Sequence, residues 1–375
     1  MDKIDNFFLI NDLNNLRKRH SEKASNESIS ISNDKPMFFN LNVANLGSAN
    51  KIIERSNFLN HEIFEDNAVF SYRLRDKCIE EINNLFLEKM PKSHKFSLSI
   101  CFGSSLISNL LALNLRIFYG RKPLLLTSSS EHIGGIEPFT HHADVHKVDL
   151  DIDHIYNEAI NLGPDIIFLS HFSYEKGASI NLKILKKKLS KLPKKPLMII
   201  DCAQSLGCEE LPFDFADIIF ASSHKWLCGP RGLGLVWINK KCEKKIHPLG
   251  GDKGAFGSKL SIPGGYDFLS FFELLCSLRI YFENKNTKLI NLKNYLRDQL
   301  SDIFQVIPSD HKSMLLLTSK NDLLSSYLDL QDKGVAVKYF KNNNYFRLSP
   351  PYFYTKHDVD NVVKIIKISM NKKHV

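Results

Sequence analysis

Short apolar runs alternate with helical patterns between about residues 95 and 240. Most of the runs are apolar along their whole length rather than at alternate positions, which is typical of parallel strands buried on both faces. They predict strands at Phe96–Cys101, Pro123–Thr127, Asp144–Val148, Asp165–Ser170, Leu197–Ile200, Asp217–Ala221 and Gly234–Ile238. Helical spacing of leucine and isoleucine follows two of them, at Ser104–Phe118 and Leu182–Leu192. We therefore expect an α/β fold, a mainly parallel sheet between helices, with ligands at the carboxyl ends of its strands.

The pattern changes after about residue 250. A helical stretch through Tyr266–Phe304 carries Phe271, Leu274, Leu275, Leu278 and Tyr281 on one face. The remaining pattern predicts a strand, a helix, two short strands and a final helix, at Met314–Thr318, Asp322–Asp332, Val335–Tyr339, Tyr345–Leu348 and Lys356–Met370. These elements predict a smaller C-terminal α+β domain at 251–375, after a large domain at 36–250. Residues 1–35 are rich in Asn, Ser, Asp and Lys and predict a mobile arm or a short amphipathic helix.

Composition and charge mainly argue against classes of protein, namely nucleic-acid-binding and membrane proteins. The chain of 375 residues is 43% hydrophobic and 24% charged, with 50 Lys+Arg against 41 Asp+Glu and a net charge of +9. Its densest basic stretch, Lys183–Lys195, has apolar residues at helical spacing and no interleaved aromatics, so its lysines read as the solvated face of a helix rather than a nucleic-acid patch. No apolar run approaches the roughly 18 residues of a membrane span, and the N-terminus lacks a signal-peptide pattern. We expect a cytoplasmic protein that binds neither nucleic acid nor membrane.

The seven cysteines are odd in number and no two have CxxC spacing. This argues against a disulfide framework and against a zinc or other metal site. We expect most of them to be small buried side chains in a reducing compartment.

Candidate chemistry concentrates between residues 199 and 238. Asp201 ends one apolar run, and Lys225 follows the next run 24 residues later, so both are expected at the same edge of the sheet. Lys225 lies between His224 and Trp226 and leads into a Gly-Pro-Arg-Gly turn. An isolated lysine is usually a solvated surface residue. A lysine, a carboxylate and a nearby phosphate-binding turn are, however, what pyridoxal 5′-phosphate (PLP) needs, because the amine forms a Schiff base and the carboxylate keeps the pyridine nitrogen protonated.

A second segment has the pattern of an anion site. Gly103, Ser104 and Ser105 open a predicted helix, where free backbone N–H groups and the helix dipole favour a phosphate. Taken alone, such a start indicates only a helix N-cap.

Over roughly residues 38–370 the sequence resembles the class V aminotransferase family of fold type I PLP-dependent enzymes. That family includes cysteine desulfurases, isopenicillin N epimerase-like enzymes and kynureninases. The motifs occur in the family's order: Cys101-Phe-Gly-Ser-Ser, Ser130-Glu-His, Ser170-His-Phe-Ser-Tyr, Asp201-Cys-Ala-Gln, Ser222-Ser-His-Lys-Trp and Tyr345-Phe-Arg-Leu-Ser.

The resemblance implies roles for particular residues of these motifs. The phosphate would be bound by Gly103, Ser104, Ser105, Ser222 or Ser223, and His224. Lys225 would carry PLP as a Schiff base, while the ring would be held by His132 stacking on it, Asp201 at its nitrogen and Gln204 at its phenolic oxygen. The substrate α-carboxylate would be gripped by Arg347, near Tyr174, which stands where cysteine desulfurases have Asn. The resemblance also implies a homodimer.

Two positions depart from the family pattern. Gly265 stands where a threonine often reaches the phosphate of the partner subunit. Ala336–Tyr345 contains no cysteine, which disfavours the persulfide chemistry of desulfurases.

The sequence therefore predicts a PLP-dependent enzyme acting at the α-carbon of an amino acid. Transamination or C–S/β-elimination lyase chemistry is favoured over epimerisation, because no second base for the opposite face is evident. The alternative from another class is a catalytically idle relative that acts as a binding protein. The joint presence of Lys225, Asp201, His132 and Arg347 argues against it. Nothing in the pattern indicates the substrate side chain.

Overall fold

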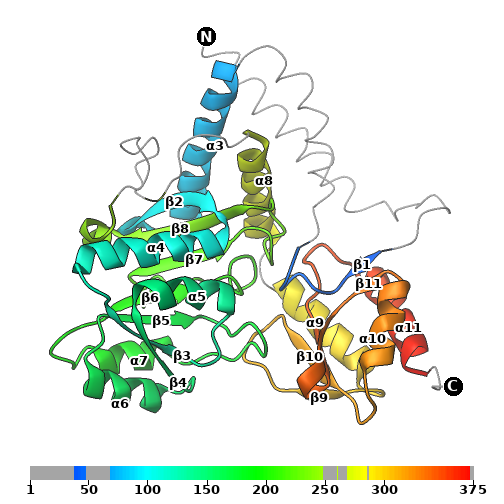
Figure 1. The fold of residues 1–375 in the computed structure, drawn as a ribbon. Coiled ribbons are helices and arrows are strands. Elements are labelled where there is room, and N and C mark those ends of the chain that lie inside the picture. Colours follow the sequence, from blue (N-terminus) through cyan, green and yellow to red (C-terminus); the bar gives the residue numbers. More distant parts are fainter. Residues whose placement is uncertain (1–37, 48–67, 248–259, 261–267, 285–286, 372–375) are drawn as a thin grey trace. The chain divides into compact units, whose positions relative to one another are not determined.

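The computed structural model describes residues 38–47, 68–247, 260, 268–284 and 287–371 (Figure 1). The chain divides into two units, Met1–Phe38 and Phe39–Val375, and all the helices and strands of the described residues belong to the second. The predicted arm, residues 1–35, lies outside the described residues, as does the predicted boundary at residue 250. The division into an arm and two domains therefore stays a prediction.

The seven predicted strands form one sheet. They are β2 (Phe96–Phe102), β3 (Leu124–Ser128), β4 (Asp144–Val148), β5 (Ile166–Ser170), β6 (Leu197–Asp201), β7 (Ile218–Ser222) and β8 (Leu233–Asn239). Their order is β2-β8-β7-β6-β5-β3-β4, and only β8 runs against its neighbours. Strands β6 and β7 are buried at every position, as their unbroken apolar runs predict. The prediction of a mainly parallel sheet is confirmed.

Helices cover this sheet. Helices α4 (Gly103–Tyr119) and α5 (Ile133–His142) share a core with alternate residues of β5 to β8. Helices α6 (Ile152–Leu162) and α7 (Leu182–Leu189) follow β4 and β5, and α7 buries Leu182, Leu185 and Leu189 while exposing lysines. The predicted amphipathic helix is therefore present, with its lysines on the outer face. Helix α3 (Ala68–Lys89) packs against α8 (Phe268–Asn284), where Arg279 bonds Glu81 at 2.9 Å. Short 3-10 helices occur at η1 (Pro91–Lys95), η2 (Lys240–Lys245) and η3 (Lys341–Asn343).

The C-terminal residues form a four-stranded antiparallel sheet. It contains β9 (Gln305–Ile307), β10 (Leu315–Thr318), β12 (Lys338–Phe340) and β13 (Tyr345–Leu348), in the order β12-β13-β10-β9. One face, with Phe346 and Leu348, packs on α9 (Thr287–Leu300), α10 (Leu324–Asp332) and α11 (Lys356–Asn371). The other face, with Leu316 and Tyr345, packs around Trp226. The second face therefore lies against the turn that carries Lys225.

The segment 39–47 joins this sheet to the same turn. Strand β1 (Phe39–Asn40) pairs in parallel with β11 (Val335–Ala336). Further on, the Gly47 N–H donates to the carbonyl oxygen of His224 at 2.5 Å. A Cβ atom on Gly47 would lie 2.5 Å from the Lys225 carbonyl oxygen, so this close approach requires glycine.

Two predicted elements differ from those observed. The stretch Tyr266–Phe304 was expected as one helical run, but it forms α8 and α9, which end and begin at Asn284 and Thr287, with β9 following at Gln305. Val335–Tyr339 was expected as one strand, but it forms β11 and β12, because Val335–Ala336 pairs with β1 whereas Lys338–Phe340 pairs with β13.

All seven cysteines are buried with free thiols. Across the described ranges, no helix has the length and hydropathy that a bilayer span requires.

Candidate active site

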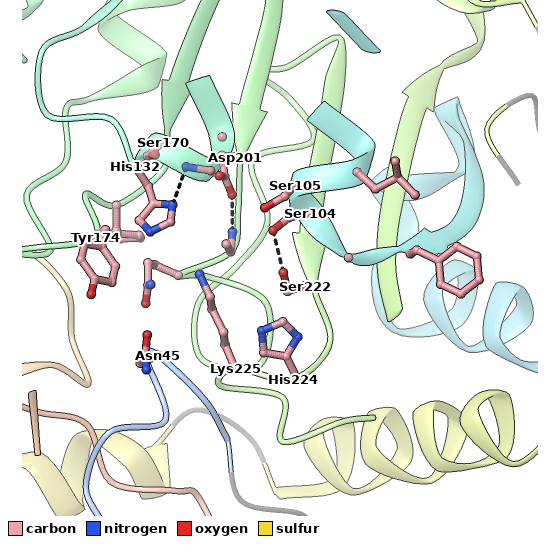
Figure 2. A pocket seen from close by; sticks show the side chains of 18 of the residues that line it. Asn45, Ser104, Ser105, His132, Ser170, Tyr174, Asp201, Ser222, His224 and Lys225 are labelled. Carbon is pink, nitrogen blue, oxygen red and sulfur yellow. Dashed lines mark hydrogen bonds between the residues drawn. The ribbon is translucent and has the colours of Figure 1, made fainter. Parts of the chain in front are cut away.

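A pocket of about 460 Å³ opens where β2, β5, β6 and β7 end (Figure 2). Because these strands are parallel to one another, their carboxyl ends meet at one edge of the sheet. All the predicted site residues except Arg347 line this pocket: Gly103, Ser104, Ser105, His132, Tyr174, Asp201, Gln204, Ser222, His224 and Lys225. The lining also includes Ser170 and Phe172, which belong to a quoted motif but were given no role, and Asn45, which the sequence did not indicate.

The start of α4 forms one end of the pocket. Gly103 is the first residue of the helix and has φ +52, a conformation that glycine adopts without strain. The Ser222 hydroxyl donates to the Ser104 hydroxyl at 2.7 Å, which joins the end of β7 to the helix start. Of the two serines that the resemblance offered, Ser222 lines the pocket, whereas the Ser223 hydroxyl donates to the Pro230 carbonyl oxygen at 2.6 Å. The free N–H groups of the first helical turn and these hydroxyls suit an anion.

His224 adds a second sign of an anion site. Its Nδ1 atom is buried and has no hydrogen-bond partner within the described ranges. Burial, together with the positive charges of Lys225 and Arg231, lowers the pKa of His224 to about 4. A neutral imidazole with an unpaired buried nitrogen, beside a helix N-terminus, fits a phosphate group.

Asp201 and Lys225 both line the pocket. Asp201 ends β6, and its Oδ1 atom accepts a hydrogen bond from the Ala203 N–H at 2.8 Å. Figure 2 shows the Lys225 ammonium group pointing into the pocket, toward the side where Asp201 and His132 lie. Both side chains line the pocket, and the charge of each acts on the other.

Each of these two groups perturbs the other. Burial raises the pKa of the Asp201 carboxyl, and the charge of Lys225 opposes that shift. Burial lowers the pKa of the Lys225 ammonium, which Asp201 opposes and Arg347 reinforces. A lowered pKa makes the neutral amine easier to reach than in an exposed lysine, and a neutral amine is both a nucleophile and a base.

His132 lies across the pocket from the helix start. It is the N-cap of α5, and its Nδ1 atom accepts from the Gly134 N–H at 3.1 Å, which leaves the proton of the neutral ring on Nε2. Its ring meets the edge of Tyr174, with centroids 4.8 Å apart. Burial lowers the pKa of His132, and the charges of Lys225, Arg347 and Lys338 lower it further.

Glu131, the residue before His132, is a second carboxyl next to the pocket and is half-buried. Its Oε2 atom accepts from the Ser170 N–H at 3.0 Å and from the Ser170 hydroxyl at 2.5 Å. Burial raises the pKa of Glu131 to about 7. The hydrogen bonds hold the pocket-lining Ser170 against this carboxyl.

Gln204 joins three segments around the pocket. Its Nε2 atom donates to the Ala44 carbonyl oxygen at 2.9 Å, and its Oε1 atom accepts from the Trp226 indole N–H at 2.9 Å. Both ends of the amide are thus bonded within the protein. The role at a phenolic oxygen stays a prediction.

Arg347 lies on β13, outside the lining of the pocket and 0% exposed. Its guanidinium donates to the Tyr174 carbonyl oxygen, and to the Asn42 Oδ1 atom at 3.5 Å, and lies 4.6 Å from the centre of the Tyr174 ring. Its Nε atom is buried without a hydrogen-bond partner within the described ranges. Tyr174 lines the pocket, and Arg347 contacts Tyr174 without lining the pocket itself. Burial lowers its pKa to about 10.

His311, which the sequence analysis missed, holds several site segments together. It is 0% exposed, and its ring stacks on Trp226 at 4.8 Å with an interplanar angle of 20°. Its Nε2 atom donates to the Gln204 carbonyl oxygen at 2.7 Å, while Nδ1 accepts from the Ser313 N–H at 3.1 Å. Burial lowers its pKa to about 3, so the ring is neutral. No local motif marks His311, because its partners are distant in the sequence.

The fold and this pocket define a class of protein. The chain has the fold of the fold type I PLP-dependent enzymes, with its pocket at the carboxyl edge of the large sheet. Residues 103–258 match the family model described as "Aminotransferase class-V". The resemblance predicted from the motifs is therefore confirmed over these residues.

Three similar proteins give the context. The chain is 31% identical over 83 residues to a "Probable hercynylcysteine sulfoxide lyase" of Mycobacterium tuberculosis, a match that covers 22% of this chain and only 20% of that protein. It is also similar to a solved "NIFS-LIKE PROTEIN", with TM-score 0.73, 16% identity and coverage of 88% of this chain and 99% of the other. The cystine C-S lyase C-DES is the third, with TM-score 0.71, 15% identity and coverage of 89% and 96%, in a structure that has glycine covalently linked to its PLP cofactor. At these identities the two solved structures establish the fold.

Proposed function

We propose that this protein is a PLP-dependent enzyme acting at the α-carbon of an amino acid. The observation that carries the proposal is the convergence of Lys225 and Asp201, from the ends of neighbouring strands, in one pocket with an anion-binding helix start. When bound, PLP supplies an electron-withdrawing ring that weakens the bonds at the α-carbon of an attached amino acid.

The residues of the pocket fit this cofactor. The unpaired Nδ1 atom of His224, the helix start at Gly103 and the Ser104–Ser222 pair would hold the phosphate. Asp201 would hold a proton at the ring nitrogen, because a buried carboxylate is most stable beside a cation. Lys225 would be the covalent attachment point.

Lys225 also has the properties of the catalytic base. Its Nζ atom reaches into the pocket, and its lowered pKa favours the neutral amine. After release from the cofactor, that amine would remove the proton from the substrate α-carbon. Arg347 would orient the substrate through its α-carboxylate, which requires the Tyr174 side chain to yield.

For the reaction type, we favour transamination or C–S/β-elimination over epimerisation. Desulfurase chemistry of the kind that passes sulfur to an enzyme thiol is disfavoured, because all seven cysteines are buried and none lines the described pocket. Two of the similar proteins carry the word lyase in their names, which supports elimination.

The experiment is a panel of amino acids added to the PLP-loaded protein, with assays for pyruvate, ammonia, sulfide and transamination. Turnover of at least one amino acid is expected in the wild type. Asp201→Asn, which keeps the size of the side chain, should retain the cofactor on Lys225 and lose turnover by several orders of magnitude. Binding of amino acids with no turnover would favour the idle binding protein instead.

We also propose that the protein is a homodimer through α4. Leu106, Leu113 and Ile117 recur at helical spacing and are 36%, 37% and 51% exposed, and Leu106 reaches the pocket lining. A second copy on this face would close the open side of the pocket. The paired change Leu113→Glu and Ile117→Glu should give a monomer by light scattering. Ile160→Glu, on the exposed surface of α6, should leave the mass unchanged.

A further inference from the structure

Two cations stand side by side on the C-terminal sheet. In the register of β12 and β13, Lys338 lies directly opposite Arg347. Opposite residues of an antiparallel pair share one face, with Cβ atoms about 4.5–5.5 Å apart, and like charges in that arrangement are destabilising. Leu316 continues the same row on β10 and packs in the cluster around Trp226. The two cations therefore lie on the face that is turned toward the Lys225 turn.

No carboxylate forms an ion pair with either cation in the described part of the chain. The two acceptors of Arg347, the Tyr174 carbonyl and the Asn42 amide oxygen, are neutral, and its buried Nε atom has no partner there. The described contacts of the Lys338 ammonium comprise only the Phe340 ring, at 5.7 Å.

The negative charge that acts on Arg347 from nearby is that of Glu175, whose carboxylate accepts from the Tyr345 hydroxyl at 2.9 Å. One carboxylate beside two cations leaves a surplus positive charge. Buried or partly buried charge without a counter-ion is costly, so the arrangement is explained if a ligand supplies the missing negative charge.

This surplus charge acts on the pocket. Lys338 and Arg347 both contribute to the lowered pKa of His132, which lines the pocket. Aromatic rings lie between the two cations and the pocket: the Tyr174 ring is centred 4.6 Å from the Arg347 guanidinium and 6.0 Å from the centre of the Phe340 ring. Figure 2 shows Tyr174 and His132 on the side of the pocket away from Ser104 and Ser222, where the phosphate would bind. A substrate would approach this side.

We propose that the substrate is an amino acid with a second acidic group in its side chain, and that Lys338 and Arg347 together bind its two acidic groups. The second group is a carboxylate, sulfinate or sulfonate close to the α-carbon, and Lys338 selects it. This inference rests on the proposed function and names its substrate class. It makes Lys338 a specificity-determining residue that the family motifs do not include.

Isosteric pairs of amino acids test the inference. The PLP-loaded protein is titrated by calorimetry and by absorbance with L-aspartate against L-asparagine, and with L-glutamate against L-glutamine. The wild type should bind the acidic member of at least one pair about tenfold more tightly, the scale of one charged hydrogen bond. Lys338→Gln should remove this preference and leave the amide affinity within about twofold. Lys341→Gln removes the same charge from an exposed side chain in the next turn of the chain and should keep the preference.

The outcomes separate this inference from the proposed function. If no amino acid binds or alters the spectrum, the proposed function fails, and the substrate class with it. If amino acids bind but acids and amides bind equally to the wild type, the inference alone is overturned. It is also overturned if Lys338→Gln weakens acids and amides to the same extent, or leaves the preference intact.

Discussion

Replacing Arg347 with methionine separates a substrate-binding role from a structural one. The side chain is 0% exposed, and methionine fills a similar volume without a charge. The change removes two hydrogen bonds to neutral acceptors, on Tyr174 and Asn42, and the contacts of the guanidinium with two aromatic rings. It also removes a charge that has no ion-pair partner within the described ranges.

The contributions to stability partly offset one another. The two lost hydrogen bonds cost about 1 kcal/mol each, and the lost cation–π contacts about 0.5–1 kcal/mol each. Removing a poorly paired buried charge is favourable by about 1–4 kcal/mol. The net change in the free energy of unfolding therefore lies between a gain of about 1 kcal/mol and a loss of about 3 kcal/mol. Loss of the charged contact with a substrate carboxylate costs about 1.5–3 kcal/mol, a weakening of roughly 10- to 150-fold.

The assay compares two readouts on one variant. The melting temperature of the cofactor-free Arg347→Met protein should change by only a few degrees, whereas the affinity for amino acids should fall at least about tenfold. Amines that lack the α-carboxylate should bind as they do to the wild type. A large drop in melting temperature with unchanged amino acid affinity would refute the reasoning and make Arg347 a structural residue.

Three further predictions concern histidines and a carboxyl around the pocket. Burial keeps the pKa of His224 at about 4, and a bound phosphate would raise it. PLP binding near pH 6, followed by calorimetry in buffers of different ionisation enthalpy, should therefore take up more protons in the wild type than in His224→Gln, and equal uptake would contradict the assignment. Burial raises the pKa of Glu131 from 4.5 to about 7, so the folded protein holds this proton more tightly than the unfolded chain, and the free energy of unfolding should fall as pH rises through that interval. Glu131→Gln should flatten this slope in urea denaturation between pH 5 and 7.5, and an unchanged slope would count against it. His311→Phe keeps the stacking on Trp226 but loses the hydrogen bond to the Gln204 carbonyl oxygen, so it should lower kcat about tenfold with little change in KM and shift the absorbance of bound PLP. His311→Gln keeps a hydrogen-bond donor and should lie closer to the wild type. Equal losses of kcat in the two variants would indicate a merely structural role for His311.

Most strands of the large sheet were predictable because they are local apolar runs, although Asp144–Val148 contains Asp, His and Lys. Asp144–Val148 and Tyr345–Leu348 have the predicted bounds, and β6 ends at Asp201 as the run implies. What was not predictable depends on partners far away in the chain. The reversed direction of β8 and the pairing of β1 with β11 leave no local pattern, and the short β9 is mostly exposed.

The residues of the candidate site likewise fall into those that local motifs indicate and those that long-range packing brings in. Residues in motifs at strand ends, such as Ser104, Asp201 and Lys225, meet in the pocket because topology brings strand ends together. Asn45 and His311 were missed, because they reach the site through long-range packing of the segment 39–47 and of the chain between β9 and β10. Arg347 was expected to face the pocket, whereas it lies behind Tyr174, since nothing in the sequence fixes the position of the aromatic rings.

The most direct test of the account asks where PLP attaches. The purified protein is incubated with PLP, reduced with borohydride, digested with trypsin and analysed by mass spectrometry, with Lys225→Ala treated in parallel. We predict a pyridoxyl adduct on the peptide that contains Lys225, and loss of the absorbance band of the bound cofactor in the Lys225→Ala variant. An adduct on a different lysine, or an equal band in the variant, would contradict the central claim that Lys225 and Asp201 form a PLP site.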